Sequence, residues 1–263
     1  MKRAFLINNI CVLCEIIQKN KHLKVSFLNS VPKEENIEII KKQIQKICNT
    51  QTDIREFYKT IKKDNTLSKI SSNFSGLKPP LAASLFEAMI IAITEQQLNI
   101  SVAISQRTKL VKNFGEKVSF ENKEYYSFPS FKHIADLSSG KIHKLGFSSK
   151  KAEYMILAAK LINENQINEE QLKCMDIENA RCKLMSFHGI GPWTAEYILL
   201  RGLNRCDVSM LSDAGIKKAI SFFYFKNKEP DIKELLELSN NWGKYKGYAA
   251  FYLLYAYQLN LSL

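Results

Sequence analysis

A turn between two helices carries the residues of this sequence best suited to chemistry. His188-Gly189-Ile190-Gly191 interrupts a helical apolar pattern, and Pro192 stands where a second helix begins. Two glycines around an inward-pointing Ile190 allow another backbone to approach closely, so the N–H groups at the start of the second helix suit a phosphate oxygen. The alternative is that this G-x-G is only a tight connection between helices.

The elements that must position this turn are helices on both sides of it. Apolar residues recur at helical spacing upstream, at Ile177, Ala180, Leu184 and Phe187, and downstream, at Ala195, Ile198, Leu199 and Gly202. An irregular segment, Asp207-Val208-Ser209-Met210-Leu211-Ser212, follows, and either Ser212 or Asp213 can cap the next expected helix, 214–222. The pattern therefore delivers one carboxylate, that of Asp213, at a helix start beyond the hairpin.

These motifs resemble those of a known superfamily. F-H-G-I-G-P-W-T-A followed by D-V-S-M-L-S-D is similar to the signature of the helix-hairpin-helix (HhH-GPD) DNA glycosylases, and most similar to their AlkA-type 3-methyladenine branch. The resemblance extends to L-F-E-A with E-Q-Q near residue 90 and to W-G-K-Y-K-G-Y-A near residue 245, and so covers residues 80–258. It implies a mainly helical HhH glycosylase fold.

The resemblance places the chemistry on Asp213. Cleavage of an N-glycosidic bond builds positive charge on the sugar, which a fixed carboxylate stabilises while it orients or deprotonates the attacking water. Asp207 is the competing carboxylate, in the less catalytic place of the signature. The plain structural alternative is that Asp213 is only an N-cap.

The residue two positions after Gly191 decides the reaction type. Members that also cut the strand carry a lysine there, whose amine forms a Schiff base, whereas this chain has Trp193. We therefore expect a glycosylase without AP lyase activity. The residues expected to form an aromatic base pocket, which would attract cationic alkylated purines, are Trp193, Tyr197, Tyr245 and Trp242. For each aromatic the alternative is a place in the core.

DNA contacts are expected from two regions. A polar patch after the apolar helix 81–93 matches the family segment that enters the minor groove, and Gln97 or Leu98 would fill the gap left by the flipped nucleotide. The alternative is a solvated helix end with Leu98 in the core. The remaining candidate DNA contacts are His188, Gly189, Gly191, Thr194 and Lys150. Lys151 is equally placed to touch phosphate, while solvated helix-end lysines and a simple turn role for His188 are the alternatives.

No cofactor is expected beyond one ion. The carbonyls of Met185, Phe187 and Ile190 match those that hold a monovalent cation, Na⁺ or K⁺, in the related enzymes. Six scattered cysteines include one C-x-x-C, Cys11 and Cys14, in a strand-like run, and we interpret these two as buried thiols. We predict no iron–sulfur cluster and no metal catalysis.

Charge and composition restrict the partner. The 263 residues are 46% hydrophobic and 24% charged, enough for a sizeable core, and 38 Lys+Arg against 26 Asp+Glu give a net charge of +12. A polyanionic partner follows naturally, and double-stranded DNA with damaged bases is expected. No apolar run spans a bilayer and no cleavable leader stands at the N-terminus, so we expect an intracellular monomer, in cytoplasm, nucleoid or nucleus, without membrane or obligate protein partner.

The patterns before residue 79 predict a small α+β domain. Strand-like runs at 5–7, 11–17 and 23–28 precede a helix at 34–48 and short helices at 53–63 and 67–74. Gly76-Leu77-Lys78-Pro79-Pro80 marks the boundary, which gives an N-terminal domain at 1–78, resembling a TBP-like domain with a shortened sheet, and a helical glycosylase domain at 79–263. Terminal helices of the two are expected to pack across this boundary.

Later helices are expected at 102–114, 131–137, 142–145, 150–163 and 242–261, with a polar connection at 116–128. The combined interpretation is a monofunctional base excision repair glycosylase that flips alkylated purines, 3-methyladenine and 7-methylguanine, and leaves an abasic site. One alternative is an HhH glycosylase for oxidised or deaminated bases such as 8-oxoguanine, hypoxanthine or uracil. The other is a non-catalytic DNA-binding HhH protein.

Overall fold

The computed structural model describes residues 1–20 and 22–261, and the chain packs as two compact units. Unit 1 consists of Met1–Gln45 and Met89–Asn168, and unit 2 of Lys46–Ala88 and the chain from Glu169 onward. Residues 46–78 thus pack with the C-terminal helices, whereas the sequence suggested a domain that ends at residue 78. The domain boundary at 78/79 stays a prediction, and the mainly helical fold class is confirmed.

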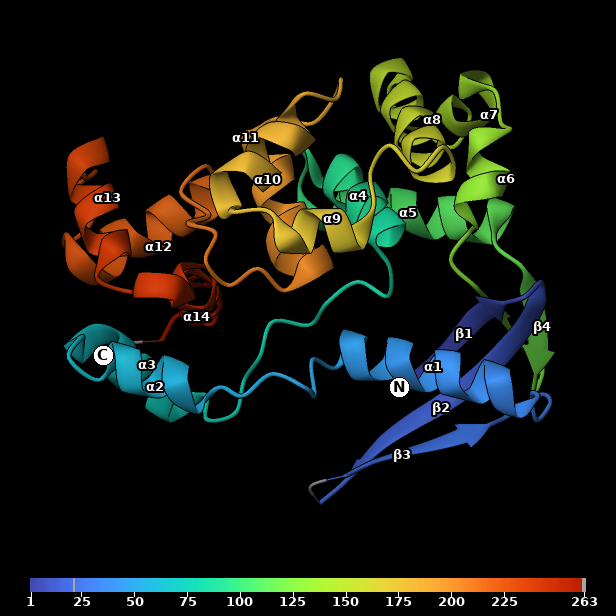
Figure 1. The fold of residues 1–263 in the computed structure, drawn as a ribbon, viewed down its shortest axis with the longest axis horizontal. Helices are drawn as coiled ribbons and strands as arrows, with labels where there is room; N and C mark the ends of the chain where they lie inside the picture. The colour runs from blue at the N-terminus through green and yellow to red at the C-terminus, as the bar shows by residue number, and fades with distance from the viewer. Residues whose placement is uncertain (21, 262–263) are drawn as a thin grey trace. The chain divides into compact units, whose positions relative to one another are not determined.

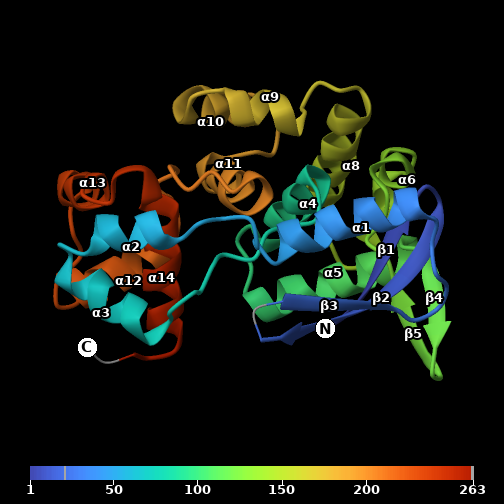
Figure 2. The ribbon, with the colours of Figure 1, turned by 60° about the horizontal axis from the view of Figure 1, so that its bottom comes forward.

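An antiparallel sheet opens unit 1. Its strands β1 (Lys2–Ile7), β2 (Ile10–Lys19) and β3 (His22–Phe27) lie in the order β1-β2-β3, with Phe5 opposite Val12 and Ile16 opposite Val25. Asn8 and Asn9, both with positive φ, make the two-residue turn that the twist of a hairpin favours. The helix α1 (Glu34–Ile47) lies over one face of this sheet in both views (Figures 1 and 2). The three strands and this helix were predicted.

A second hairpin follows α5 (Ile100–Phe114) where the sequence suggested only a connection. Strands β4 (Lys117–Phe120) and β5 (Lys123–Tyr126) pair across Glu121-Asn122, which both have positive φ, and contact β2 and β1 respectively. Their pairing buries little, and only half-buried side chains such as Val118 and Tyr125 mark the inner face. An Asn in a two-residue turn between short alternating runs was the available signal.

Three further helices complete unit 1. They are α6 (Phe131–Ala135), α7 (Ser139–His143) and α8 (Ser149–Asn163), and α8 packs against both others. Ser148 accepts the N–H of Lys151 as the N-cap of α8, which satisfies one of the four free donors at the helix start. The glycine and serines before this helix predicted that start.

An aromatic core organises one part of unit 2. It joins α2 (Arg55–Ile61) and α3 (Asn65–Asn73) to α12 (Ala214–Tyr224), α13 (Ile232–Asn240), the 3₁₀ turn Gly243–Tyr245 and α14 (Lys246–Gln258). Phe57 and Tyr252, both fully buried, have ring centroids 5.1 Å apart. In both views α2 and α3 lie beside α14 (Figures 1 and 2), and α3 and α12 contact it. Burial of these rings contributes to the apolar contact that holds the helices together.

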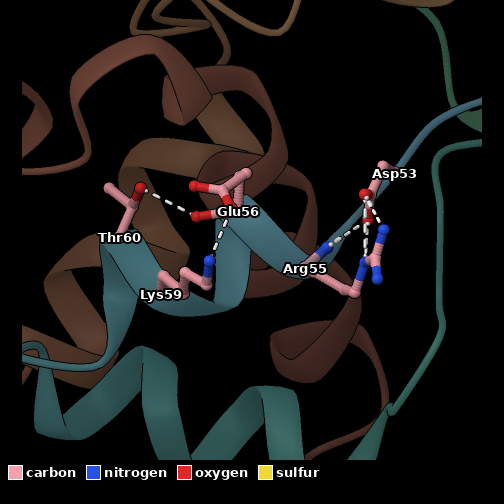
Figure 3. A network of polar contacts seen from close by, with 5 residues as sticks. All are labelled: Asp53, Arg55, Glu56, Lys59 and Thr60. Atoms are coloured by element: carbon pink, nitrogen blue, oxygen red, sulfur yellow. Dashed lines mark hydrogen bonds and ion pairs between the residues drawn. The ribbon is translucent and has the colours of Figure 1, made fainter.

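The exposed face of α2 carries its ion pairs. The Arg55 guanidinium donates to both carboxylate oxygens of Asp53, and Lys59 donates to Glu56 at 2.8 Å, as Figure 3 shows. The Thr60 hydroxyl donates to the backbone carbonyl of Glu56. Because all four charged groups lie in water, these pairs add little to the stability of the fold.

The remaining helices carry the hairpin. They are α4 (Leu85–Glu95), through which the chain passes from unit 2 to unit 1, α9 (Glu169–Cys174), α10 (Ile177–Met185) and α11 (Pro192–Tyr197), which continues into a π-helical turn, η1 (Ile198–Gly202). A Cβ on Gly202 would lie 2.8 Å from the Cβ of Ala88, so the absent side chain allows η1 to approach α4 closely. Helix α4 starts at Leu85, four residues later than the apolar run 81–93 predicted.

Membrane and cysteine features are simple within the described residues. None of the helices there is long and apolar enough to cross a membrane. Cys14 is buried, which raises the pKa of its thiol to about 11, whereas Cys11 is half-buried and its thiol pKa is also raised by burial. The interpretation as buried thiols is thus right for Cys14 and only partly right for Cys11.

Candidate active site

The hairpin turn forms between α10 and α11 as the sequence predicted. The Ile190 N–H donates to the carbonyl of Phe187 at 3.1 Å, and the Ile190 side chain is buried. Gly189 has a φ of +87°, which only glycine adopts without strain. Gly191 instead is extended, and a Cβ there would meet nothing within 4 Å. The first glycine is therefore required by the turn, and the second leaves an open face at the start of α11.

Asp213 lies at the end of an irregular loop and is the N-cap of α12. Its Oδ1 accepts the N–H of Ile216 at 2.9 Å, and its Oδ2 accepts the indole Nε1–H of Trp193 at 2.6 Å. In the loop before it, Met210 has a φ of +55°, a backbone conformation that residues other than glycine rarely adopt. Asp213 is thus an N-cap, as its structural alternative held, and it is also tied to the hairpin helix.

The competing carboxylate, Asp207, is committed elsewhere. Arg205 donates to both of its oxygens, at 3.0 and 2.8 Å, in a bidentate ion pair. The same guanidinium donates to the carbonyls of Leu172 and Met175 and so joins the loop to the end of α9. This geometry gives Asp207 a structural task and leaves Asp213 as the candidate for chemistry.

Two of the four predicted pocket aromatics form a pair on α11. The rings of Trp193 and Tyr197 have centroids 5.4 Å apart at an angle of 40°, and both side chains are half-buried. The guanidinium of Arg201, one turn further, lies 5.8 Å from the centre of the Tyr197 ring. Two half-buried aromatic rings beside Asp213 suit a flat, electron-poor base, which can stack on their π faces.

The other two aromatics lie in the core of unit 2. Trp242 is 1% exposed, and its Nε1–H donates to Asp64, which also accepts the Tyr224 hydroxyl. Tyr245 is 8% exposed and packs edge-on against Phe57 at 5.9 Å. We therefore drop Trp242 from the pocket, because its polar edge and ring are both satisfied inside the unit, and the place of Tyr245 in a pocket stays a prediction.

Besides Asp213 there is a second carboxylate near the site, on α11, which the sequence analysis missed. Glu196 is 4% exposed, and its Oε2 accepts both the backbone N–H of Ser212, at 3.2 Å, and the Ser212 hydroxyl. Burial raises the pKa of this carboxyl. The available signal was one acidic residue within the otherwise apolar run T-A-E-Y-I-L-L, three positions after Trp193.

The predicted DNA contacts differ in exposure. His188, Gln97 and Lys150 are exposed, and Leu98 is 39% exposed, so the alternative of Leu98 in the core does not hold. Thr194 is 2% exposed, and we remove it from the contact set because its side chain faces the core. The contacts of the exposed residues with DNA stay predictions.

Lys151 is used within unit 1 rather than left for a phosphate. Its Nζ donates to the carbonyls of Thr94 and Gln96, at 2.8 Å each, at the end of α4. Gln97 follows with a φ of +52°, and Asn99 caps α5 by accepting the N–H of Ser101. The segment predicted to enter DNA is thus held at both ends.

Comparison with known proteins shows the family of this chain. A model described as the HhH-GPD superfamily base excision DNA repair protein matches residues 90–244. The DNA-3-methyladenine glycosylase of Bacillus subtilis is 34% identical over 89% of this chain and 78% of its own length, and DNA-3-methyladenine glycosylase 2 of Escherichia coli is 27% identical over 73% and 64%. The solved 3-methyladenine DNA glycosylase of Archaeoglobus fulgidus is similar with a TM-score of 0.84 and 25% identity, over 100% of this chain and 88% of the other. The chain belongs to the HhH-GPD superfamily of base excision DNA repair proteins.

Proposed function

We propose that this protein is a monofunctional DNA glycosylase that hydrolyses the N-glycosidic bond of alkylated purines, 3-methyladenine and 7-methylguanine, and leaves an abasic site. The observation that carries the proposal is the hydrogen bond between Trp193 and Asp213, because it joins a carboxylate and an aromatic face at the end of the hairpin. The names of the Bacillus and Archaeoglobus relatives support the alkylated-purine class.

Asp213 has the geometry that bond hydrolysis requires. Its two oxygens each accept one N–H, which fixes the carboxylate, and each retains acceptor capacity for a water or for the charge that develops on the sugar. Its place at the start of the 11-residue helix α12 puts the negative charge where the helix dipole stabilises it. A fixed carboxylate can therefore stabilise an oxocarbenium-like transition state and orient the attacking water.

The aromatic pair supplies the preference for a cationic base. Stacking and cation–π attraction contribute roughly 0.5–2 kcal/mol for each well-placed ring. Trp193 and Tyr197 present two such rings within one helical turn. N-alkylation leaves 7-methylguanine and 3-methyladenine positively charged or electron-poor, so these bases gain more from the pair than ordinary purines do.

Strand cleavage is not part of the proposed reaction. An AP lyase needs an amine that attacks the sugar through a Schiff base, and the position two residues after Gly191 holds Trp193 instead of lysine. Lys217 and Lys218 are exposed on α12, beyond the carboxylate. Hydrolysis by water is the reaction that the remaining groups support.

Duplex DNA with a damaged base is the proposed partner. In unit 2, the hairpin N–H groups with His188, Gly189 and Gly191 would bind a DNA phosphate. In unit 1, Lys150 would bind another phosphate, and Gln97 or Leu98 would fill the gap that the flipped nucleotide leaves in the DNA helix. A net charge of +12 favours such a polyanion. An intracellular location follows from this substrate.

A monovalent cation at the hairpin belongs to the proposal. Carbonyl oxygens suit Na⁺ or K⁺, and the Phe187 carbonyl, which accepts the Ile190 N–H, keeps a second lone pair for such an ion. The carbonyls of Met185 and Ile190 would complete the set. The ion would supply positive charge next to a DNA phosphate, and it takes no part in bond cleavage.

The test is base release from DNA treated with dimethyl sulfate, with released bases identified by chromatography and strand nicking scored before and after alkali. Release of 3-methyladenine or 7-methylguanine, nicking only after alkali, no adduct trapped by borohydride and no release by Asp213→Asn are expected. Release only from 8-oxoguanine, hypoxanthine or uracil duplexes would overturn the lesion class. Parental release by Asp213→Asn would overturn the role of the carboxylate.

A further inference from the structure

Helix α11 holds the loop that ends at Asp213 by two side chains, not one. Trp193 donates to Asp213, and Glu196, three residues later, accepts two hydrogen bonds from Ser212, the preceding residue of the loop. The two attachments have opposite polarity, since one is a donor from the helix and the other an acceptor. Together they fix two successive residues immediately before α12 begins.

The loop has little regular structure of its own to hold that position. Met210 adopts a positive φ and is buried. The Asp213 N–H donates to the Met210 carbonyl at 3.1 Å and closes a tight turn. A tight turn fixes local shape but not the distance from the loop to α11. Long-range attachments must therefore set that distance, and within the described residues Glu196 provides two of them.

Open space lies behind the loop at Glu196. A cavity of about 380 Å³ within unit 2 is lined by Glu196, Ser212, Arg181 and Ser239, among others. Two buried polar atoms, the Ser239 hydroxyl and the Arg181 Nε, have no hydrogen-bond partner there. A loop that lost its hold on Glu196 would have room to move away from Trp193.

A buried negative charge on Glu196 destabilises the fold, so its presence indicates a functional role. Burying a carboxylate is unfavourable unless its partners compensate for the lost hydration. Arg181 on α10 lies 3.6 Å from its Oε1, and burial nevertheless raises the pKa of the carboxyl, with the nearby Asp213 acting in the same direction. An apolar residue at this place in an apolar helix would cost less, so the carboxylate is better explained by the two Ser212 donors that it accepts.

We propose that Glu196 is a positioning residue, which accepts the N–H and hydroxyl of Ser212 and thereby holds the neighbouring Asp213 at its distance from Trp193. The inference rests on the proposed function, since it assigns Asp213 to the reaction. Glu196 acts through Ser212 and does not touch the substrate. Its loss should slow the chemical step and leave binding of DNA almost unchanged.

Four variants separate this role from a general loss of stability. Glu196→Ala removes both acceptors, and Glu196→Gln keeps an oxygen that can accept both Ser212 donors while it removes the charge. Ser212→Ala removes only the hydroxyl bond. Glu178→Gln is the matched control, because Glu178 lines the same cavity and lies 3.6 Å from Arg181 but has a 74% exposed side chain and no bond to the loop.

The measurements are single-turnover release of 7-methylguanine, affinity for a duplex with a tetrahydrofuran abasic analogue, and urea unfolding. Misplacement of a reacting group costs up to about 100-fold, so Glu196→Ala should lose about 10- to 100-fold in single-turnover rate. Its affinity for the analogue should stay within about twofold. Glu196→Gln should recover most of the rate, and Ser212→Ala together with Glu196→Ala should be no slower than Glu196→Ala alone, because coupled residues are not additive.

The outcomes distinguish the two claims. A parental rate for folded Glu196→Ala, or an equal fall in Glu178→Gln, overturns the positioning role while Asp213→Asn remains inactive. A parental rate for Asp213→Asn overturns the proposed function itself. Should Glu196→Ala not fold, Glu196→Gln and Ser212→Ala decide: the proposal requires a smaller loss in the first than in the second, and the reverse order contradicts it.

Discussion

The indole Nε1 of Trp193 lies 2.6 Å from Oδ2 of Asp213, so one side chain of the hairpin helix can serve both the base and the carboxylate. A ring that only stacks on the base would have no need of this orientation. The bond makes the ring and the carboxylate a single unit. Substitutions at Trp193 should therefore have two separable effects.

Trp193→Phe keeps a π face and removes the N–H donor. Because a hydrogen bond to a charged group contributes about 1.5–3 kcal/mol, we expect base release to fall by about 10- to 100-fold, equally for cationic 7-methylguanine and neutral hypoxanthine. Trp193→Leu should add a further loss confined to the cationic base. Single-turnover rates on both lesions measure this, and a lesion-selective fall in Trp193→Phe would argue that the donor acts on the base instead.

Arg201 should temper the preference for cationic bases. Its guanidinium lies 5.8 Å from the Tyr197 ring and 5.9 Å from the Phe251 ring, so its charge competes for the π face on which the base would stack. Arg201→Met should raise the ratio of 7-methylguanine to hypoxanthine release by about two- to fivefold, of the order of one cation–π interaction. Arg201→Lys retains the charge and is the control; an unchanged ratio in Arg201→Met would exclude the effect.

Two neighbouring lysines on α8 should have different roles: Lys151 in stability of the fold and Lys150 in binding of DNA. Lys151 holds the carbonyls of Thr94 and Gln96, and Lys151→Met should lower the free energy of unfolding by about 1–2 kcal/mol. Lys150 is exposed, and Lys150→Met should leave stability unchanged but make the slope of log affinity against log salt shallower by about 1. Urea unfolding and DNA titrations at several salt concentrations measure the two effects, and exchanged phenotypes would show the roles to be reversed.

Acid should weaken the ion pairs around Glu169. Burial raises the pKa of this carboxyl, but the hydrogen bonds from Lys46 and Lys173 outweigh burial and leave the pKa below its usual 4.5. A carboxyl with a lowered pKa in the folded state contributes stability that is present above the unfolded pKa and lost as pH falls through the folded pKa.

The expected result is that Glu169→Gln is less stable than the parent by about 1 kcal/mol at neutral pH and that the difference shrinks below pH 4.5. Urea unfolding at a series of pH values measures it, with Glu170→Gln as control because that side chain is 84% exposed. A difference that grows as pH falls would have the wrong sign for this assignment.

Much of the site was predictable from sequence because its signals are local. Gly189 and Pro192 fix the turn by backbone conformation alone, and an Asp before an amphipathic run predicts an N-cap, as Asp213 proves to be. The sheet strands follow from alternation in the same way. Each of these features depends on residues within a few positions of one another.

The errors arose where distant residues decide. Trp242 is in the core because Asp64 accepts its N–H, and Glu196 is tied to the loop because Ser212 folds back onto α11. Neither partner is visible from the local pattern. The hairpin of β4 and β5 was missed for a different reason, since its strands are four residues each and half exposed, and give almost no periodic signal.

The division of the chain has a consequence for its synthesis on the ribosome. Helices α2 and α3 leave the exit tunnel early, yet their partners come near the end: Asp64 is separated from Trp242 by 178 positions, and Phe57 packs against Tyr252. Domains generally fold as units during translation, and transiently exposed apolar surface invites aggregation. The nascent chain must therefore carry an uncovered Phe57 through most of elongation, and a ribosome that stops before α14 releases a polypeptide in which unit 2 cannot close its core.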